Sequence, residues 1–205
     1  PGFHGLPDFM NNWPDDDLYM RWTQAGVFTS HMRYHGASPR EPYEYPKIAD
    51  LVRKWWNLRY ALIPYLKEQG DKVVKTGFPL MRALLFHHPD DPYCWYIDDE
   101  FYCGEDLLVA PVMNPEGKRD VYLPEGRWTD FWTGEMLRGP VRLKGIVSPL
   151  SRIPVYCVTG SKIPVYPEII QHTGEMDLTK VKELVFDGSY KGFSKSILGG
   201  NIRLG

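Results

Sequence analysis

The sequence predicts an α/β segment followed by an all-β segment. Residues 18–77 combine two amphipathic helical patterns with a short apolar run that ends in a polar loop, which is the rhythm of βα units in a parallel sheet or barrel. Residues 107–166 carry short strand-like runs separated by turns about every ten residues, a spacing typical of an antiparallel β-sandwich. We therefore predict three parts, residues 1–77, 78–167 and 168–205, of which the last is too short to bury a core of its own.

Composition argues against several classes of partner. Hydrophobic residues make up 43% of the chain and charged residues 24%, which fits a globular protein. The formal net charge of -2 gives no electrostatic reason to expect nucleic acid or an anionic membrane, and no apolar run reaches the roughly 20 residues of a membrane span. Aromatic residues, at 14%, fit either a well-filled core or stacking on sugar rings.

The cysteines predict a reducing compartment. Cys94, Cys103 and Cys157 are an odd number without CxxC spacing, which argues against both a disulfide framework and a zinc site. We expect a cytoplasmic protein with no metal and no cofactor. The residues from Pro1 show neither an initiator Met nor the basic and apolar segments of a signal peptide, so we do not expect this to be the natural start.

The first predicted helix covers residues 18–26 and follows a loop. Its apolar face is formed by Leu18, Trp22 and Ala25. The acidic run Asp15–Asp17 lies where carboxylates cap free N–H groups and suit the helix dipole, an interpretation that we favour over a cluster of functional carboxylates. Residues 27–30 are apolar and β-branched and predict a short buried strand.

The second predicted helix runs from Lys47 to about Gly70, after an extended loop that contains prolines. Its apolar stripe consists of Ile48, Leu51, Val52, Trp55, Leu58, Leu62 and Leu66. Pro64 lies inside this helix and is expected to kink it or split it in two. Residues 72–76 can add a further turn before Gly77 stops the helix.

Strand signals dominate after Gly77. Strands are expected at residues 78–86, 107–112, 120–123, 127–132, 141–143, 153–157, 163–166 and 183–186. The loop after the first of these contains His87, His88, Asp90 and Asp91, but adjacent histidines point in different directions and rarely chelate one ion. The acidic run Asp98–Glu100 predicts a helix start or a solvated face.

The stretch Thr29–Gly36 places two histidines and an arginine after the first predicted strand, where the loops of βα folds line active sites. Neutral imidazole offers one hydrogen-bond donor and one acceptor, so His35 can bond a vicinal diol of a sugar. The alternative is a structural histidine bonded to loop backbone, and the residues alone leave both open. We expect His31 to be structural and Arg33 to tie the loop to nearby carboxylates.

Several stretches that follow one another in order carry a family resemblance: Gly2-Phe3, Leu18–Gly26 leading into Ser30–Gly36, Leu58–Leu66, Pro79–Arg82, Gly104–Val112 and Tyr122–Trp128. Together they cover nearly the whole chain. The set resembles the C-terminal part of glycoside hydrolase family 31, the α-glucosidases and α-xylosidases, and its bacterial members most. Each stretch alone is a weak signal, whereas the ordered set is specific.

This resemblance implies the fold and one wall of a site. The fold would be the last βα units of a TIM (β/α)8 barrel at residues 1–77, then a proximal antiparallel β-sandwich at residues 78–167, then the start of a distal β domain or a tail. By the same resemblance residues 27–30 are barrel strand eight, Phe3 flanks the −1 sugar and His35 hydrogen-bonds its hydroxyls. Phe3 matches the end of a DIGGF motif, in which Pro1 replaces a glycine.

The resemblance implies a retaining α-glycosidase that hydrolyses α-xylosidic or α-glucosidic bonds. Family members use two aspartates in motifs that this sequence does not contain, so we assign no catalytic residue and expect the chain alone to be inactive. Asp8, Asp15–Asp17 and Asp98–Asp99 are not substitutes, because a retaining pair needs carboxyl groups about 5–5.5 Å apart in one pocket. The expected partners are an α-linked oligosaccharide or glycoside and the rest of the parent barrel with its N-terminal domain; the sequence leaves open whether the protein is an oligomer.

Two other functions remain. A transglycosylase would share the barrel and differ only in the acceptor of the sugar. A non-catalytic carbohydrate-binding protein would be built around residues 78–167, with Trp95, Trp128 and Trp132 exposed as a flat platform. Burial of these rings between sheets, which we expect, would instead indicate a structural sandwich.

Overall fold

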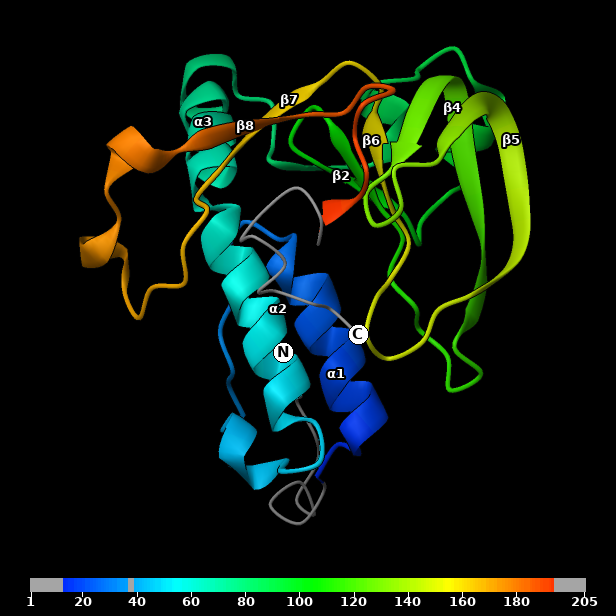
Figure 1. Ribbon diagram of the computed structural model, residues 1–205. Helices are drawn as coiled ribbons and strands as arrows, with labels where there is room; N and C mark the ends of the chain where they lie inside the picture. The colour runs from blue at the N-terminus through cyan, green and yellow to red at the C-terminus, as the bar shows by residue number, and fades with distance from the viewer. Residues whose placement is uncertain (1–12, 37–38, 194–205) are drawn as a thin grey trace.

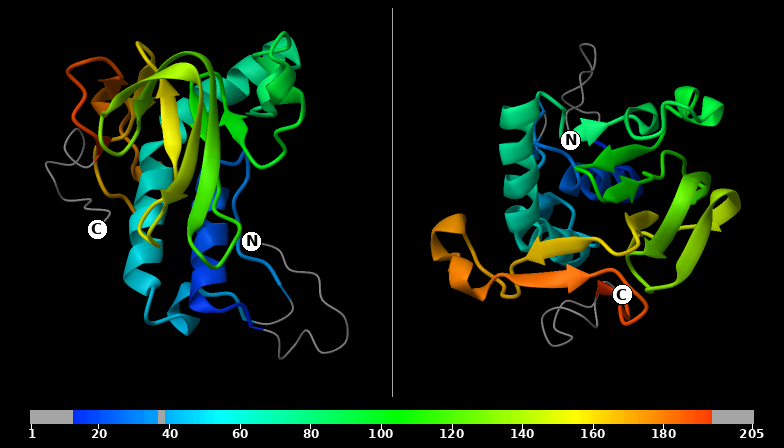
Figure 2. Two further views of the ribbon diagram at one scale, coloured as in Figure 1. Left: turned by 90° about the vertical axis from the view of Figure 1, so that its right-hand side faces the viewer. Right: turned by 90° about the horizontal axis from the view of Figure 1, so that it is seen from above.

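The computed structural model describes residues 13–36 and 39–193, and places helices beside two antiparallel sheets (Figure 1). The helices are α1 (Asp16–Val27), α2 (Ala49–Ala61) and α3 (Ile63–Thr76). Short 3-10 helices are η2 (Pro42–Glu44), η3 (Leu84–Phe86), η4 (Pro92–Trp95), η5 (Thr173–Glu175) and η6 (Leu178–Lys180). α1 and α2 lie side by side, and α3 continues from α2 toward the second sheet (Figures 1 and 2). No helix in the described ranges is long and apolar enough to cross a membrane.

The larger sheet has the strand order β1-β2-β3-β6-β4-β5, and the smaller one pairs β7 with β8. The strands are β1 (Met81–Arg82), β2 (Phe101–Cys103), β3 (Leu107–Val109), β4 (Lys118–Asp130), β5 (Met136–Val147), β6 (Val155–Val158), β7 (Lys162–Val165) and β8 (Lys182–Val185). All pairings between these eight strands are antiparallel, as the turn spacing predicted.

Helix α1 begins at the predicted cap but buries a different face from the one expected. The Asp15 carboxylate accepts a hydrogen bond from the Leu18 N–H at 2.8 Å, which confirms its capping role. Leu18 and Trp22, however, are 41% and 43% exposed. The buried face is formed by Tyr19, Met20, Arg21, Thr23, Gln24 and Val27. Polar side chains therefore lie on the covered side of the helix, which an apolar pattern cannot identify.

The strand predicted at residues 27–30 is wrong. Val27 forms the last turn of α1, Phe28 is its C-cap, and Thr29 and Ser30 form a bend. Val27 and Phe28 are fully buried, so the sequence indicated burial correctly. A short apolar run does not distinguish a buried strand from the buried end of a helix, and here it forms the end of a helix.

The second helical segment is divided as predicted. Leu62 is both the C-cap of α2 and the N-cap of α3, and Pro64 occupies an early position of α3. A proline is accepted there because the first N–H groups of a helix have no intrahelical partner. Gly77 ends α3 in a left-handed conformation with φ of 76°, which confirms the predicted stop.

Strand β4 is one continuous strand across the turn that was predicted at Pro124–Gly126. Gly126 pairs with Gly139 of β5, and the register shifts between Leu123 and Gly126, so a bulge accommodates one extra residue in β4. A Cβ on Gly139 would lie 1.9 Å from the Pro124 carbonyl oxygen, so only glycine fits opposite the bulge. The strand predicted at residues 78–86 is reduced to β1 followed by η3.

The core fills both faces of the larger sheet. Alternate residues of β3 and β6 point to opposite sides because side chains of a strand alternate. One side, with Leu107, Val109, Val155 and Cys157, joins the residues buried by α1, α2 and α3 and those of β7 and β8. The other, with Leu108 and Tyr156, packs on Tyr102, Val121, Leu123 and Trp128. The helices therefore share one apolar cluster with one face of the larger sheet and with the smaller sheet, and the other face of the larger sheet has a cluster of its own.

The described part of residues 168–193 closes this core. β8 pairs with β7 over Lys162↔Val185 to Val165↔Lys182. Phe186 and Phe193 stack on Phe131 with ring centroids 5.8 and 4.9 Å apart. The segment thus gains stability from residues that precede it rather than from a core of its own.

Candidate functional site

The candidate site is the extended segment 31–36 that leaves α1. Exposure alternates along it: Met32 and Tyr34 are partly buried, whereas His31, Arg33 and His35 are exposed. This period of two is the pattern of a strand that is covered on one side. His31, Arg33 and His35 therefore share the open face, and His35 forms a single β-bridge.

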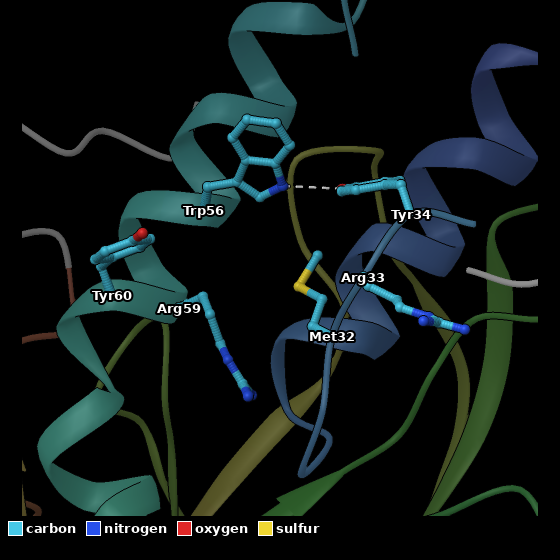
Figure 3. Close-up of a pocket in the computed structure, with 6 residues that line it drawn as sticks. All are labelled: Met32, Arg33, Tyr34, Trp56, Arg59 and Tyr60. Atoms are coloured by element: carbon cyan, nitrogen blue, oxygen red, sulfur yellow. Dashed lines mark hydrogen bonds between the residues drawn. The ribbon is translucent and has the colours of Figure 1, made fainter. Parts of the chain in front are cut away.

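The covered face is fixed by Tyr34, which is bonded from both neighbouring helices. The Tyr34 hydroxyl lies 2.8 Å from Thr23 Oγ1 of α1 and accepts a hydrogen bond from Trp56 Nε1 of α2 at 3.0 Å (Figure 3). Its ring stacks on Tyr19 with centroids 5.2 Å apart. Burial raises the pKa of the Tyr34 hydroxyl, so it stays neutral and acts as a hydrogen-bonding anchor.

The start of the segment is held by Arg59 of α2. Its Nη1 donates to the carbonyl oxygens of Val27 and Thr29 at 2.7 and 2.5 Å, and its Nη2 donates to that of Ser30 at 3.0 Å. Burial lowers the pKa of the Arg59 guanidinium from its very high ordinary value. Three carbonyl groups of one turn thus share one cation.

A cavity of about 290 Å³ lies between the extended segment and α2. It is lined by Met32, Arg33, Tyr34, Trp56, Arg59 and Tyr60. Figure 3 shows Trp56 and Arg59 reaching from α2 toward the segment, while Tyr60 stays beside the helix and Arg33 points away from it. The Trp56 indole N–H and the Arg59 guanidinium already have partners in the protein, so they hold the wall in place.

The predicted site residues are placed unequally. His35 is described and exposed on the open face, whereas Phe3 lies outside the described residues. His31 Nδ1 lies 3.2 Å from its neighbour Ser30 Oγ, a local contact that fits a structural role. Arg33 was expected to pair with a carboxylate, but within residues 13–36 and 39–193 no carboxylate lies at ion-pair distance from it.

The acidic clusters are engaged elsewhere. Asp16 and Asp17 lie 4.0 and 3.8 Å from Lys47 and Arg21, and Asp99 Oδ2 lies 2.9 Å from Arg119 Nη2. Glu100 was predicted to start a helix or face solvent, yet it is buried and bonded to the Tyr122 N–H at 2.8 Å. That prediction is wrong because Arg119, distant in sequence, draws the carboxylate inward.

The histidine pair and the tryptophans also have defined surroundings. His87 Nε2 lies 3.1 Å from Arg82 Nη1, and His88 Nε2 lies 2.7 Å from the Tyr102 hydroxyl, so the two histidines have different hydrogen-bond partners, although both rings lie against the Tyr102 ring. Trp128 is buried and Trp132 is partly buried, as a structural sandwich requires, whereas Trp95 is 58% exposed. The three rings therefore do not form an exposed platform.

Comparison with known proteins places the whole arrangement in one family. The model of the glycosyl hydrolase family 31 TIM-barrel domain matches residues 1–69, and the model of the family's C-terminal domain matches residues 77–163. The chain belongs to glycoside hydrolase family 31. The predicted fold class, the end of a (β/α)8 barrel followed by an antiparallel β domain, is confirmed.

Curated relatives of this family 31 chain include glycosidases and transferases. It is 38% identical over 152 residues to α-glucosidase 2 of Bacillus thermoamyloliquefaciens, which covers 72% of this chain and 19% of that protein. It is 31% identical over 163 residues to the α-xylosidase of Saccharolobus solfataricus, covering 78% and 22%. The chain thus spans about a fifth of the length of these relatives.

Solved structures of family 31 members have the same fold. The Flavobacterium johnsoniae family 31 dextranase complexed with isomaltotriose superposes with a TM-score of 0.76 at 36% identity, covering 84% of this chain and 22% of that one. The cycloalternan-degrading enzyme from Trueperella pyogenes in complex with isomaltose gives 0.68 at 34% identity, covering 72% and 23%. Both neighbours hold α-linked oligosaccharides.

Several residues of the site were not predicted from the sequence. Thr23, Tyr34 and Arg59 form the bonds that fix the wall, and none was singled out for that role. The spacing of Met32 and Tyr34 by two residues was the available signal for the covered face.

Proposed function

We propose that this chain forms one wall of the active site of a retaining α-glycosidase that hydrolyses α-xylosidic or α-glucosidic bonds. The observation that carries the proposal is that side-chain exposure alternates along residues 31–36. Tyr34 is held between the helices, and His35 lies on the open face. In a (β/α)8 barrel, side chains opposite the helices face the barrel interior, and catalysis occurs at the C-terminal ends of the strands. Relatives named α-glucosidase and α-xylosidase support the choice of bonds.

In this proposal His35 hydrogen-bonds hydroxyl groups of the −1 sugar, and Phe3 flanks that sugar across the pocket. A neutral imidazole can donate to one hydroxyl of a diol and accept from the other. Bonds to sugar hydroxyls that tighten in an oxocarbenium-like transition state contribute several kcal/mol in glycosidases. The nucleophile and the acid/base would be aspartates from a part of the protein outside these 205 residues.

Replacement of His35 by Ala in the full-length enzyme tests the role. We expect kcat/KM on an aryl α-glucoside or α-xyloside to fall roughly 100-fold, with an unchanged thermal unfolding midpoint because the side chain is exposed. His172→Ala is the matched control, since His172 is also exposed but lies beyond β7. Unchanged kinetics of the His35 variant would reject the assignment.

We further propose that the isolated chain is inactive. Its substrate-binding wall lacks the two aspartates that retention requires. The purified chain should release no nitrophenol from nitrophenyl α-glucoside or α-xyloside above the rate without protein. Turnover proportional to its concentration would contradict this proposal.

A transglycosylase is the second candidate, because a related protein of Sporosarcina globispora, 30% identical, is named isomaltosyltransferase. It covers 78% of this chain, and this chain spans 16% of it. Product analysis with an α-linked disaccharide separates the two functions. Free monosaccharides alone indicate hydrolysis, whereas longer oligosaccharides indicate transfer to a sugar acceptor.

We also propose a cytoplasmic location, supported by the free thiols of Cys94, Cys103 and Cys157. All three are buried, and burial raises the pKa of the Cys94 and Cys103 thiols to about 12. Fractionation of the source cells, with activity or antibody detection, tests the location. Recovery of the protein outside the cytoplasm would overturn it.

A further inference from the structure

Within residues 13–36 and 39–193, the turn that leads into the site is held by hydrogen bonds from the side chain of Arg59. Residues 28–34 lie outside any strand, and their first carbonyl groups face α2. The Val27 carbonyl belongs to the last turn of α1, where carbonyl groups have no intrahelical partner. Thr29 Oγ1 adds contacts to the carbonyl oxygens of Gly26 and His31 at 2.8 and 2.7 Å.

Arg59 fits this task because its guanidinium is planar and carries several donors in a rigid fork. Two of its nitrogens bond three carbonyl oxygens, those of Val27, Thr29 and Ser30. Without it, partly buried carbonyl groups would lose their partners, which proteins avoid. A lysine ammonium at the end of a flexible stem cannot reproduce the fork.

The consequence for the site follows from the alternation of the segment. A slip of one residue along an extended chain moves every side chain to the other face. Arg59 fixes the chain at Ser30, and Tyr34 fixes it four residues later through Thr23 and Trp56. One anchor lies just before the segment and the other directly before His35, and together they set which side chains face the open side.

We infer that Arg59 is a positioning residue for the sugar-binding wall, acting through His35 without touching the sugar. The inference rests on the proposed function. It predicts that a change at Arg59 lowers activity by displacing His35, so that the loss disappears once His35 is absent. A displacement of about 1 Å at a catalytic site can cost on the order of 100-fold in rate.

The experiment is a double-mutant cycle in the full-length enzyme with the variants Arg59→Lys, His35→Ala and their combination. We expect Arg59→Lys to lower kcat/KM on an aryl α-glycoside roughly 10- to 100-fold, as loss of an orienting partner does elsewhere. In the His35→Ala background the same change should cost less than about threefold, since coupled residues are not additive. Arg53→Lys is the matched control, because Arg53 lies on the same helix but is exposed and pairs with Asp50 at 3.1 Å; it should leave kcat/KM unchanged.

Three results would count against the inference or its basis. Unchanged kcat/KM of Arg59→Lys overturns the inference, and so does an equal loss in both backgrounds, which indicates a general structural role. A His35→Ala variant with unchanged kcat/KM overturns the proposed function itself, so the two failures are distinguishable. Arg59→Gln, which keeps a planar amide donor, replaces the Lys variant in the cycle if that variant does not fold.

Discussion

Glu100 is a buried carboxyl group whose Oε2 has no hydrogen-bond partner within the described ranges. Its Oε1 accepts from the Tyr122 N–H at 2.8 Å and from Arg119 Nη2 at 3.3 Å. Desolvation raises the pKa of Glu100 to about 7, although the Tyr122 and Arg119 bonds oppose the rise. The protonated form is therefore favoured in the folded state more than in the unfolded chain.

This carboxyl group makes stability depend on pH. The pKa of Glu100 is higher in the folded state than in the unfolded chain. The stability that the protonated carboxyl group contributes is therefore fully present below the unfolded pKa near 4.5 and is lost as pH rises through about 7. We expect Glu100→Gln, which stays neutral, to raise the free energy of unfolding at pH 8 by about 1–3 kcal/mol and to change it little at pH 4.5. Urea unfolding at both pH values measures this.

Glu105→Gln is the matched control for the Glu100 variant. Glu105 is exposed and lies 2.7 Å from Lys72 Nζ, and this hydrogen bond lowers its pKa. Glu105→Gln should therefore not raise the free energy of unfolding at pH 8. An equal effect of the two variants at pH 8 would contradict the role of Glu100.

Gly104 shows how one missing side chain permits two parts of the fold to meet. Its φ is +69°, and a Cβ there would lie 2.5 Å from the Tyr65 hydroxyl and 2.6 Å from Gln69 Cγ. We expect Gly104→Ala to lower the free energy of unfolding by about 3 kcal/mol, through backbone strain and displacement of α3. Gly145→Ala, with φ of +61° and open space around it, should cost only the strain of about 1 kcal/mol. Equal losses by chemical denaturation would refute the steric argument.

At the scale of elements, proline determines where one helix ends and the next begins. Leu62 serves as a cap on both sides, and α3 holds Pro64 where its missing N–H costs nothing. The bulge in β4 has the opposite effect, since it lets Pro124 and Glu125 remain inside one strand. Proline therefore separates two helices at one position and is tolerated within a bulged strand at another.

Pro64 and Lys67 provide a test at this scale. We expect Pro64→Ala to change the free energy of unfolding by less than about 1 kcal/mol, because the N–H that it restores has no intrahelical partner. Lys67→Pro, at an exposed site inside α3, should cost about 3 kcal/mol or more because it breaks an internal hydrogen bond. Thermal unfolding followed by circular dichroism distinguishes them. A large loss from Pro64→Ala would show that the proline stabilises the joint itself.

At the scale of the whole molecule, the helices and the sheets are joined by a common core and by specific hydrogen bonds. The Tyr65 hydroxyl of α3 donates to the Cys103 carbonyl oxygen at 2.8 Å and accepts from the Asp106 N–H at 3.2 Å. The Tyr166 N–H, just after β7, donates to the Ala61 carbonyl oxygen of α2 at 2.8 Å. The part that carries the candidate site is thereby tied to the β domain.

These contacts between the helices and the β domain predict that the chain unfolds cooperatively. Tryptophan fluorescence and far-ultraviolet circular dichroism should give coincident urea transitions. We expect Tyr65→Phe to lower the free energy of unfolding by about 1–2 kcal/mol, because it leaves buried groups unbonded, and to leave a single transition. Tyr60→Phe, whose hydroxyl makes only a 3.4 Å contact to Gln171, should cost less than about 0.5 kcal/mol. Two separate transitions in the unmodified chain would show that the helices and the β domain are independent.

The sequence by itself determined features that depend on a few neighbouring residues. The cap at Asp15, the division near Pro64, the stop at Gly77 and the antiparallel strands follow from backbone restrictions that act locally. The family resemblance added the barrel and the β domain, which the family models confirm. The roles of His35 and Phe3 stay predictions.

Only the tertiary structure decided which side chains are covered. Gln24 of α1 donates to the Leu150 carbonyl oxygen at 2.6 Å, and Glu100 meets Arg119, so burial of these polar groups depends on partners distant in sequence. The strand predicted at residues 27–30 became a helix end for the same reason, since Phe28 packs against Trp55 and Phe131. Local patterns specify backbone conformation, whereas the face that an element buries, and with it the exposure of His35, is set by elements that meet only in the folded chain.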